Sequence, residues 1–170
     1  MTTPILETER LTLRAHRVDD FAEMAAMWAD PIVVLHIGNK PSTGEQSWAR
    51  LLRYAGHWAL LGYGFWAVEE RASGRLAGEI GLADFKREIE PAIADPECGW
   101  VLSPWCHGRG YATEALRAVL AWADARFPAT ACIIDPDNQA SRNVAAKCGF
   151  VEQGRSTYQG DEVVRYHRLA

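Results

Sequence analysis

The residues whose types and spacing could do chemistry lie past mid-chain, in the glycine-punctuated stretch 106–114 (CHGRGYATE). An apolar run over 97–102 precedes it and predicts a strand that ends before Pro104. Apolar residues then recur at helical spacing through Phe127, which predicts a long helix. Glycines let the backbone approach a ligand, and the free N–H groups at a helix start favour negative charge. We therefore interpret the stretch as a binding site for a diphosphate.

Two familiar phosphate-binding motifs fit this stretch poorly. A Walker loop needs Gly-Lys-Ser/Thr, which the sequence lacks. A dinucleotide-binding fold has Gly-x-Gly-x-x-Gly in its first strand–helix turn, but here Thr113 replaces the third glycine and the loop comes late. The segment 107–112 instead resembles the coenzyme A loop of the GNAT (Gcn5-related N-acetyltransferase) superfamily, Gln/Arg-x-x-Gly-x-Gly/Ala. Its one departure is His107, and Glu114 corresponds to the family's acidic residue after the loop.

Further segments resemble one branch of that superfamily, which includes the ribosomal-protein N-terminal acetyltransferases. The segment 7–14 (ETERLTLR) resembles the opening of the branch. The segments 138–144 (NQASRNV) and 147–150 (KCGF) resemble its Asn-x-x-Ser and Gly-Phe signature, and 164–166 (VRY) near the end also fits. The resemblance covers nearly the whole chain.

The predicted order of elements is β-α-α-β-β-β-α-β-α-β-β, which is also the GNAT order. The resemblance implies an α+β fold of the α/β-sandwich type, with one domain over 1–170. Its mixed central sheet of about seven strands would carry helices on both faces. The expected strands are 5–16, 65–70, 76–84, 97–102, 131–134, 151–158 and 163–169. The expected helices are 20–30, 45–61 (behind a capping box of Ser42 and Glu45), 112–127 and 138–148.

Composition excludes several classes of function. The 170 residues are 48% hydrophobic and 24% charged, an ordinary globular profile. A net charge of −4 argues against a nucleic-acid partner, which would need a basic face. No apolar run could span a bilayer and no signal-peptide pattern is present, so we expect no membrane partner and a cytoplasmic location. The cysteines form no Cys-x-x-Cys pair, so we expect no metal, and Cys106 is expected to be the most exposed of them.

The resemblance implies specific contacts for the coenzyme, acetyl-CoA. Pantetheine would lie in a split between the strand ending near Leu102 and the strand 131–134, and would pair with the backbone near Val101 and Ser103. Other residues are implied to contact the coenzyme: Asn138 at the pantetheine amides, Ser141 beside the thioester sulfur, Asn143 and His107. The amides that would hold the diphosphate are those of Gly108, Arg109, Gly110, Tyr111 and Ala112.

Each of these residues also has a purely structural interpretation. Asn138 could serve only as a helix cap, and Ser141 and Asn143 could be ordinary helix residues. His107 could be a solvated loop residue. The two glycines could form a turn alone, although a helix start directly behind them favours a ligand.

The implied reaction is direct attack of an amine on the acetyl thioester, without an acetyl-enzyme. The site must then supply proximity, a route for the proton of the amine and stabilisation of the oxyanion, for which the N–H near Val101 is a candidate. Glu97 and Glu79 are candidate bases on strands near the acceptor side, or else solvated strand residues. Because alternate strand residues share a face, Gly99 is expected to leave space beside Glu97.

A tyrosine acid found in many members of the family is missing, because Ala145 stands four positions before the glycine of Gly-Phe. Ser141 or water would protonate the leaving thiolate, unless it leaves unaided, since a thiol pKa of about 8.5 makes it a fair leaving group. Deprotonating a lysine at neutral pH costs about 4–5 kcal/mol, whereas an α-amine costs about 1 kcal/mol. The site therefore suits an α-amine of a protein, a peptide or a small molecule.

Other interpretations stay open at this point. The missing tyrosine is compatible with a non-catalytic acyl-CoA-binding module that senses coenzyme or recruits a partner, and the acceptor could instead be an antibiotic, a polyamine or an amino acid. A homodimer is common in the family. Five aromatic residues either pack in the core or line an apolar acceptor groove: Trp48, Trp58, Tyr63, Phe65 and Trp66.

Overall fold

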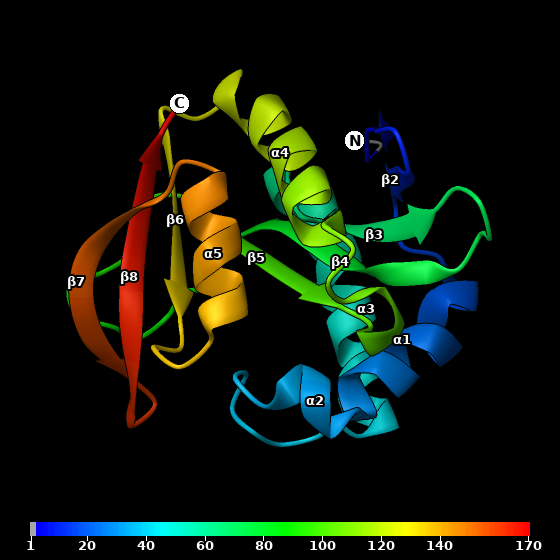
Figure 1. The fold of residues 1–170 in the computed structure, drawn as a ribbon, viewed down its shortest axis with the longest axis horizontal. Coiled ribbons are helices and arrows are strands. Elements are labelled where there is room, and N and C mark those ends of the chain that lie inside the picture. Colours follow the sequence, from blue (N-terminus) through cyan, green and yellow to red (C-terminus); the bar gives the residue numbers. More distant parts are fainter. Residues whose placement is uncertain (1–2) are drawn as a thin grey trace.

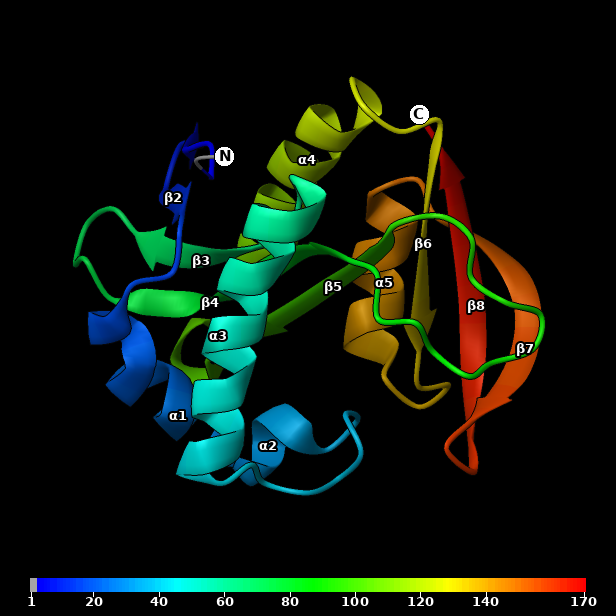
Figure 2. The same cartoon turned by 180° about the vertical axis from the view of Figure 1, so that it is seen from behind.

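In the computed structural model, which describes residues 3–170, one eight-stranded sheet carries helices on both faces (Figure 1, Figure 2). The strands are β1 (Leu6–Glu7), β2 (Leu11–Arg14), β3 (Phe65–Glu70), β4 (Leu76–Ala83), β5 (Glu97–Leu102), β6 (Ala129–Ile134), β7 (Val151–Tyr158) and β8 (Asp161–Leu169). The α-helices are α1 (Phe21–Ala29), α2 (Pro31–Val34), α3 (Gly44–Leu61), α4 (Tyr111–Asp124) and α5 (Gln139–Lys147). Neighbouring strands follow the order β1-β2-β3-β4-β5-β6-β8-β7, and only β5 and β6 pair in parallel within the described chain. The predicted fold class and the mixed sheet are confirmed.

The sheet has eight strands rather than about seven because the segment predicted as one strand over 5–16 folds into a hairpin. The Thr8 N–H donates to the Leu11 carbonyl (2.9 Å), and the Thr8 hydroxyl accepts the Leu11 N–H (3.0 Å). The chain therefore turns back, and Leu6 of β1 lies opposite Leu13 of β2. The alternation that predicted a strand is correct for β2, where Leu11 and Leu13 are fully buried.

The capping box at the start of α3 lies one residue later than predicted. The Thr43 hydroxyl accepts the Gln46 N–H (3.2 Å), and the Gln46 side-chain oxygen accepts the Thr43 N–H (2.8 Å). Ser42 and Glu45 have the same spacing, but the helix begins at Gly44, which makes Thr43 the N-cap. The helix itself ends at Leu61, as predicted, before Gly62 in the left-handed conformation (φ 74°).

The proline after α1 opens a short helix that the sequence did not predict. α1 ends at Ala29, before Pro31, as expected. Pro31 then occupies the first position of α2, where its missing N–H costs no hydrogen bond. The Asp30 carboxylate caps α2 by accepting the Ile32 N–H (2.8 Å). The result is a compact α1–α2 corner that faces α3 (Figure 1).

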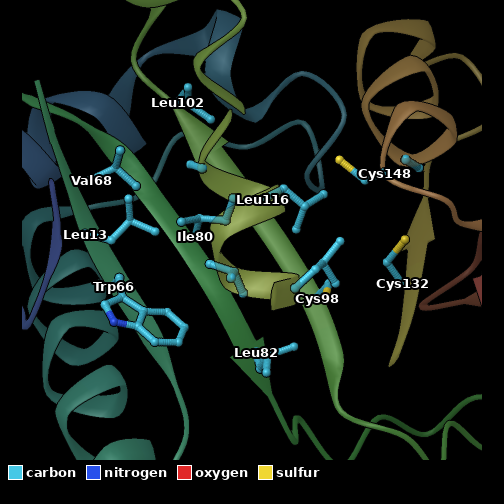
Figure 3. Close-up of a cluster of buried hydrophobic side chains, with 14 of the residues drawn as sticks. Leu13, Trp66, Val68, Ile80, Leu82, Cys98, Leu102, Leu116, Cys132 and Cys148 are labelled. Carbon is cyan, nitrogen blue, oxygen red and sulfur yellow. The ribbon is translucent and has the colours of Figure 1, made fainter. Parts of the chain in front are cut away.

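The buried side chains form two clusters, one against each face of the sheet. The first packs between the sheet and α4, where Trp66, Ile80 and Leu116 are fully buried (Figure 3). The second packs between the sheet and α1 to α3, around Met24 and Tyr54. Three of the five aromatic residues considered for an acceptor groove are core residues instead: Trp58, Phe65 and Trp66.

Cys106 is buried, contrary to the sequence prediction. Its side chain lies under the turn after β5, with Sγ 3.0 Å from the Ser103 carbonyl and 3.3 Å from the Ala77 carbonyl. Burial raises the pKa of the Cys106 thiol to about 11. This thiol is therefore a small packed side chain that helps to fix the turn.

The predicted split between two strands is present. β5 and β6 are joined by a single residue pair, Glu97 with Ala131, supported by the Ala131 N–H donating to the Pro96 carbonyl (3.1 Å). Beyond this pair the parallel strands diverge, and α5 follows the open side of β6 (Figure 1). The backbone of β5 past the pair therefore has one edge without a strand partner.

Candidate functional site

The glycine loop after β5 places a helix start without a side-chain cap at the mouth of the split. Gly108 and Gly110 adopt the left-handed conformation (φ 74° and 78°), which is strained for other residues. Gly110 is the N-cap of α4, and no side chain caps this helix among the described residues. The N–H groups of its first turn are therefore available to an anion, and the dipole of a 14-residue helix favours negative charge there.

The hairpin between β1 and β2 holds this helix start in place. The Glu114 carboxylate accepts hydrogen bonds from the Thr8 hydroxyl (2.6 Å), the Arg10 N–H (2.9 Å) and the Arg10 guanidinium (2.7 Å). Partial burial disfavours the charged form, but these hydrogen bonds hold the pKa of Glu114 below its ordinary value. The segment 7–14 and Glu114 each resemble a different family motif, and in the structure they form one unit.

The guanidinium of Arg109, a cation within the glycine loop, is already paired. It lies 3.0 Å from the Glu70 carboxylate, which also accepts the Tyr111 hydroxyl (2.5 Å). Hydrogen bonds from Ser73 and Tyr111, together with Arg109, lower the pKa of Glu70. Sequence reasoning missed Glu70, because no local pattern connects β3 to a loop about 40 positions away. Because this arginine is paired, the backbone amides are the principal hydrogen-bond donors that the loop offers to an anion.

His107 turns toward β5 instead of outward. Its Nε2 lies 2.8 Å from the Leu102 carbonyl, which ties the loop to the end of the strand. This carbonyl belongs to the edge of β5 that lacks a strand partner. His107 therefore has a structural role in this loop. Its contact with a phosphate stays a prediction.

The register of β4 and β5 corrects which backbone groups face the split. Val101 lies opposite Glu79, and the Ser103 N–H donates to the Ala77 carbonyl (2.8 Å). In an antiparallel ladder, alternate residues direct both backbone groups to the same neighbour, so Val101 and Ser103 point to β4. Pantetheine pairing was predicted near these two residues, and an oxyanion N–H near Val101. The groups that point into the split belong instead to Trp100 and Leu102.

The helix α5 carries the polar residues predicted on the other side of the split. The Asn138 side-chain oxygen accepts the Ser141 N–H (3.0 Å), so Asn138 is the N-cap, and its side-chain NH2 has no partner in residues 3–170. Ser141 is half-buried in the first turn. Asn143 is exposed and accepts a hydrogen bond from Gln139 (2.9 Å). Ala145, where a tyrosine acid would stand, is fully buried.

Glu97 is buried and paired. Arg87 makes a two-pronged contact with its carboxylate, with distances of 2.7 Å from both Nε and Nη2. The space expected beside Gly99 is occupied, because a Cβ there would come within 2.8 Å of the Phe65 ring. The side-chain space that the sequence offered to a substrate is therefore filled by the core.

Glu79 lies on the same face as Glu97 and is completely buried. One oxygen accepts the Trp28 indole N–H (2.9 Å), and the other lies 3.6 Å from Nε2 of His16. That second oxygen and the His16 nitrogen have no hydrogen-bond partner within the described residues. Neither predicted base is a solvated strand residue. Each would need a neighbour to move before it could take a proton from an acceptor.

Residues 3–170 contain neither a membrane-spanning helix nor a cluster of metal-ligating side chains. No helix in that range is long and apolar enough to cross a membrane. No group of three His, Cys, Asp or Glu side chains there could hold a metal ion.

Solved structures with similar folds are acetyltransferases. A GNAT-family acetyltransferase from Bordetella pertussis is 27% identical with a TM-score of 0.86, covering 98% of this chain and 100% of that one. RimL, a ribosomal-protein α-N-acetyltransferase solved in complex with coenzyme A, has a TM-score of 0.79 and covers 98% of both chains. At 19% identity, this structural likeness shows a shared fold alone.

Sequence comparison identifies the family directly. The Bacillus subtilis protein YkkB, itself uncharacterized, is 29% identical over 151 residues, which are 85% of this chain and 84% of YkkB. A family model described as an acetyltransferase (GNAT) domain matches residues 10–151, which include the glycine loop, the split and α5. With the site geometry described above, this match shows that the chain belongs to the GNAT family of acetyltransferases.

Proposed function

We propose that this acetyltransferase moves the acetyl group of acetyl-CoA directly to an α-amine of a protein, a peptide or a small molecule. The observation that carries the proposal is the uncapped start of α4 beside the free edge of β5. One feature suits a diphosphate and the other suits the peptide-like amides of pantetheine. The complex of RimL with coenzyme A supports the choice of coenzyme, and the branch resemblance supports an α-amine.

The coenzyme would bind along these two features. The diphosphate would lie on the amides of 108–112, and pantetheine would pair with the backbone of Trp100 and Leu102. The Asn138 NH2, which has no partner in residues 3–170, would meet the pantetheine amides. A hollow beside the start of α4 has Arg117 and Lys147 in its lining, besides the ion pair of Arg10 with Glu114 and the Glu9 side chain. Arg117 and Lys147 would contact the remaining anionic end of the coenzyme.

The chemistry then needs little from any one side chain. An α-amine arrives partly neutral at physiological pH, and its nitrogen attacks the thioester carbon. The N–H of Trp100 or Leu102 would stabilise the oxyanion, and the collapse of this intermediate releases the thiolate. Ser141 or water would return a proton to the sulfur. Glu97, once released from Arg87, or Glu79, once Trp28 or His16 moves away from it, would accept the proton of the amine.

A thiol-release assay tests the proposal. Acetyl-CoA is incubated with peptides that have free α-amines, with lysine-only peptides blocked at the N-terminus, and with polyamines and aminoglycosides. We expect thiol release with free α-amines and little with blocked peptides. Tight coenzyme binding without turnover on any amine would contradict the proposal and favour a non-catalytic binding module.

Substitution separates the proposed catalytic roles. Ser141→Ala should lower kcat by about tenfold or less, because the thiol is already a fair leaving group. If Glu97 is the base, Glu97→Gln should shift the acidic limb of the pH profile of kcat/KM. If Glu79 is the base, Glu79→Gln should do so instead. A flat response to both carboxylate variants would assign proton removal to water.

A further inference from the structure

A pocket of about 480 Å³ lies between the α1–α2 corner and α3, away from the glycine loop. Its lining includes three cationic side chains, Lys40, Arg50 and Arg53, together with Trp28 and Ser42. No acidic residue lines it. A concave site of this size with converging cations is suited to part of a small anionic molecule.

Arg50 is the unusual member of this lining. Its guanidinium lies 3.6 Å from the centre of the Trp28 ring and makes one long hydrogen bond, to the Ser42 hydroxyl (3.4 Å). In residues 3–170, no carboxylate comes within 4.0 Å of it. Burial and the neighbouring Arg53 lower the pKa of Arg50.

Other arginines withdrawn from solvent in this protein do have carboxylate partners. Arg14 contacts Asp20 (2.8 Å) and Glu69 (2.8 Å), and Arg87 contacts Glu97 (2.7 Å). A half-buried cation without a contacting counter-ion costs free energy, because the lost solvation is replaced only in part, here by the Trp28 ring and the long hydrogen bond to Ser42. A ligand that supplies the missing carboxylate would recover that cost.

The pocket connects to the strands that border the split through two side chains. Trp28, on which Arg50 stacks, donates its indole N–H to Glu79. Glu79 lies opposite Val101 of β5 on the face that α1 to α3 cover. Adjacent strands lie about 5 Å apart, so a ligand in the pocket is within a few side-chain lengths of β5.

We infer that the amine acceptor also carries a carboxylate, which the pocket binds between Arg50 and Arg53 while the amine reaches the thioester. This inference rests on the proposed function and names its acceptor class. A guanidinium binds a carboxylate through two parallel hydrogen bonds, and a stacked guanidinium is already oriented for this contact. The carboxylate can come from a free amino acid or from an acidic residue near the N-terminus of a peptide.

Matched pairs of acceptors test the inference and separate the two sources. The small-molecule pair is alanine and alaninamide, and the peptide pair is Ala-Asp-Ala-amide and Ala-Asn-Ala-amide. Rates are compared at equal concentrations of neutral amine, because the amine of alanine is more basic than that of alaninamide. In at least one pair, the carboxylate member should have a kcat/KM at least about tenfold higher, mainly through KM. Arg50→Gln should abolish this preference, Arg50→Lys should keep part of it, and neither should change the KM of acetyl-CoA. Arg126→Gln removes an exposed arginine elsewhere and serves as the charge-matched control.

A binding measurement keeps the inference testable without turnover. Glutarate is titrated into the protein saturated with coenzyme A, and the arginine Nε–H resonances are followed by NMR. The Arg50 resonance should shift, and the shift should be absent from Arg50→Gln. Equal kcat/KM within both pairs, a preference that survives Arg50→Gln, or an unmoved Arg50 resonance would overturn the inference. A shift of the Arg50 resonance that appears only in a parallel titration without coenzyme A would assign the pocket to the coenzyme and overturn the inference as well.

Discussion

Two cationic regions of this protein have opposite electrostatic arrangements. At the start of α4, Arg10 is bonded to Glu114 and Arg109 to Glu70, so each charge is neutralised by a partner within the fold. Around α3, Arg50 and Arg53 share a pocket and form no ion pair in residues 3–170.

The difference shows that a cationic side chain near a site is not by itself a ligand contact. The paired arginines hold the hairpin, β3 and the glycine loop together, and they leave anion binding to the backbone amides. The unpaired arginines contact aromatic rings but join no segments through ion pairs within residues 3–170. Stability and binding are therefore expected to respond in opposite ways to changes in the two regions.

The largest effect should follow from a side chain in the glycine loop. Gly110→Val puts a β-branched residue at φ 78°, a conformation that is strained for every residue except glycine. Relief of this strain should move the amides of 108–112 from their positions. Acetyl-CoA affinity should fall by about a hundredfold, which calorimetry measures. Gly160→Ala, at φ 93° in the β7–β8 turn and with open space around it, is the matched control. It should lose stability while it keeps affinity, and equal affinity losses would contradict the assignment.

The next effect concerns the stability of the paired region. Glu114→Ala leaves Arg10 and Thr8 without their shared acceptor. The free energy of unfolding should fall by about 1–3 kcal/mol, as for other lost charge-assisted hydrogen bonds. Urea denaturation at pH 7 measures it. A change in the free energy of unfolding below about 0.3 kcal/mol would mean that the ion pair at this helix start does not stabilise the fold.

The pH dependence of stability should report the same carboxylate. The pKa of Glu114 is lowered from 4.5 in the folded protein, so its contribution is fully present above that value and is lost as pH falls through the folded pKa. Stability should therefore drop on acidification, and Glu114→Gln should make that acid limb shallower. Urea midpoints between pH 3 and pH 7 test the sign, and identical acid limbs would show that Glu114 does not titrate with folding.

The smallest effect on stability is expected in the unpaired region. Arg50→Gln removes a partly desolvated charge and a cation–π contact, two terms of opposite sign. The free energy of unfolding should change by no more than about 0.5 kcal/mol. A loss as large as that of Glu114→Ala would show that Arg50 is structural and would remove the contrast between the regions.

The sequence predicted the segment from β5 through α4 far better than the packing around α1 to α3. The strand, the glycine loop and α4 are contiguous, so these elements can be predicted from spacing alone. The partner of Arg109 lies on β3, and the direction of the β5 backbone depends on its register with β4. Neither relation leaves a local pattern, which is why the sequence did not show that the backbone of Trp100 and Leu102, rather than that of Val101 and Ser103, faces the split.

The region around α1 to α3 depends on where helices pack. Of the two interpretations of the aromatic residues, core packing is correct for Trp58 and Trp66, and alternation and size alone do not distinguish a groove from a packed face. The pocket at Arg50 joins residues from α1, α3 and the segment between them. The spacing of Arg50 and Arg53 on α3 is an ordinary helical i, i+3 pair, and only the packing of Trp28 beneath Arg50 distinguishes it.

The most direct test of the central claim is an amide NMR titration with coenzyme A and, separately, with pantetheine, which lacks the diphosphate. With coenzyme A, the N–H resonances of 108–112 should shift together with those of Trp100 and Leu102. With pantetheine, only the two strand residues should shift. If the resonances of 108–112 stay in place with coenzyme A, or move equally with pantetheine, the amides at the start of α4 do not hold the diphosphate.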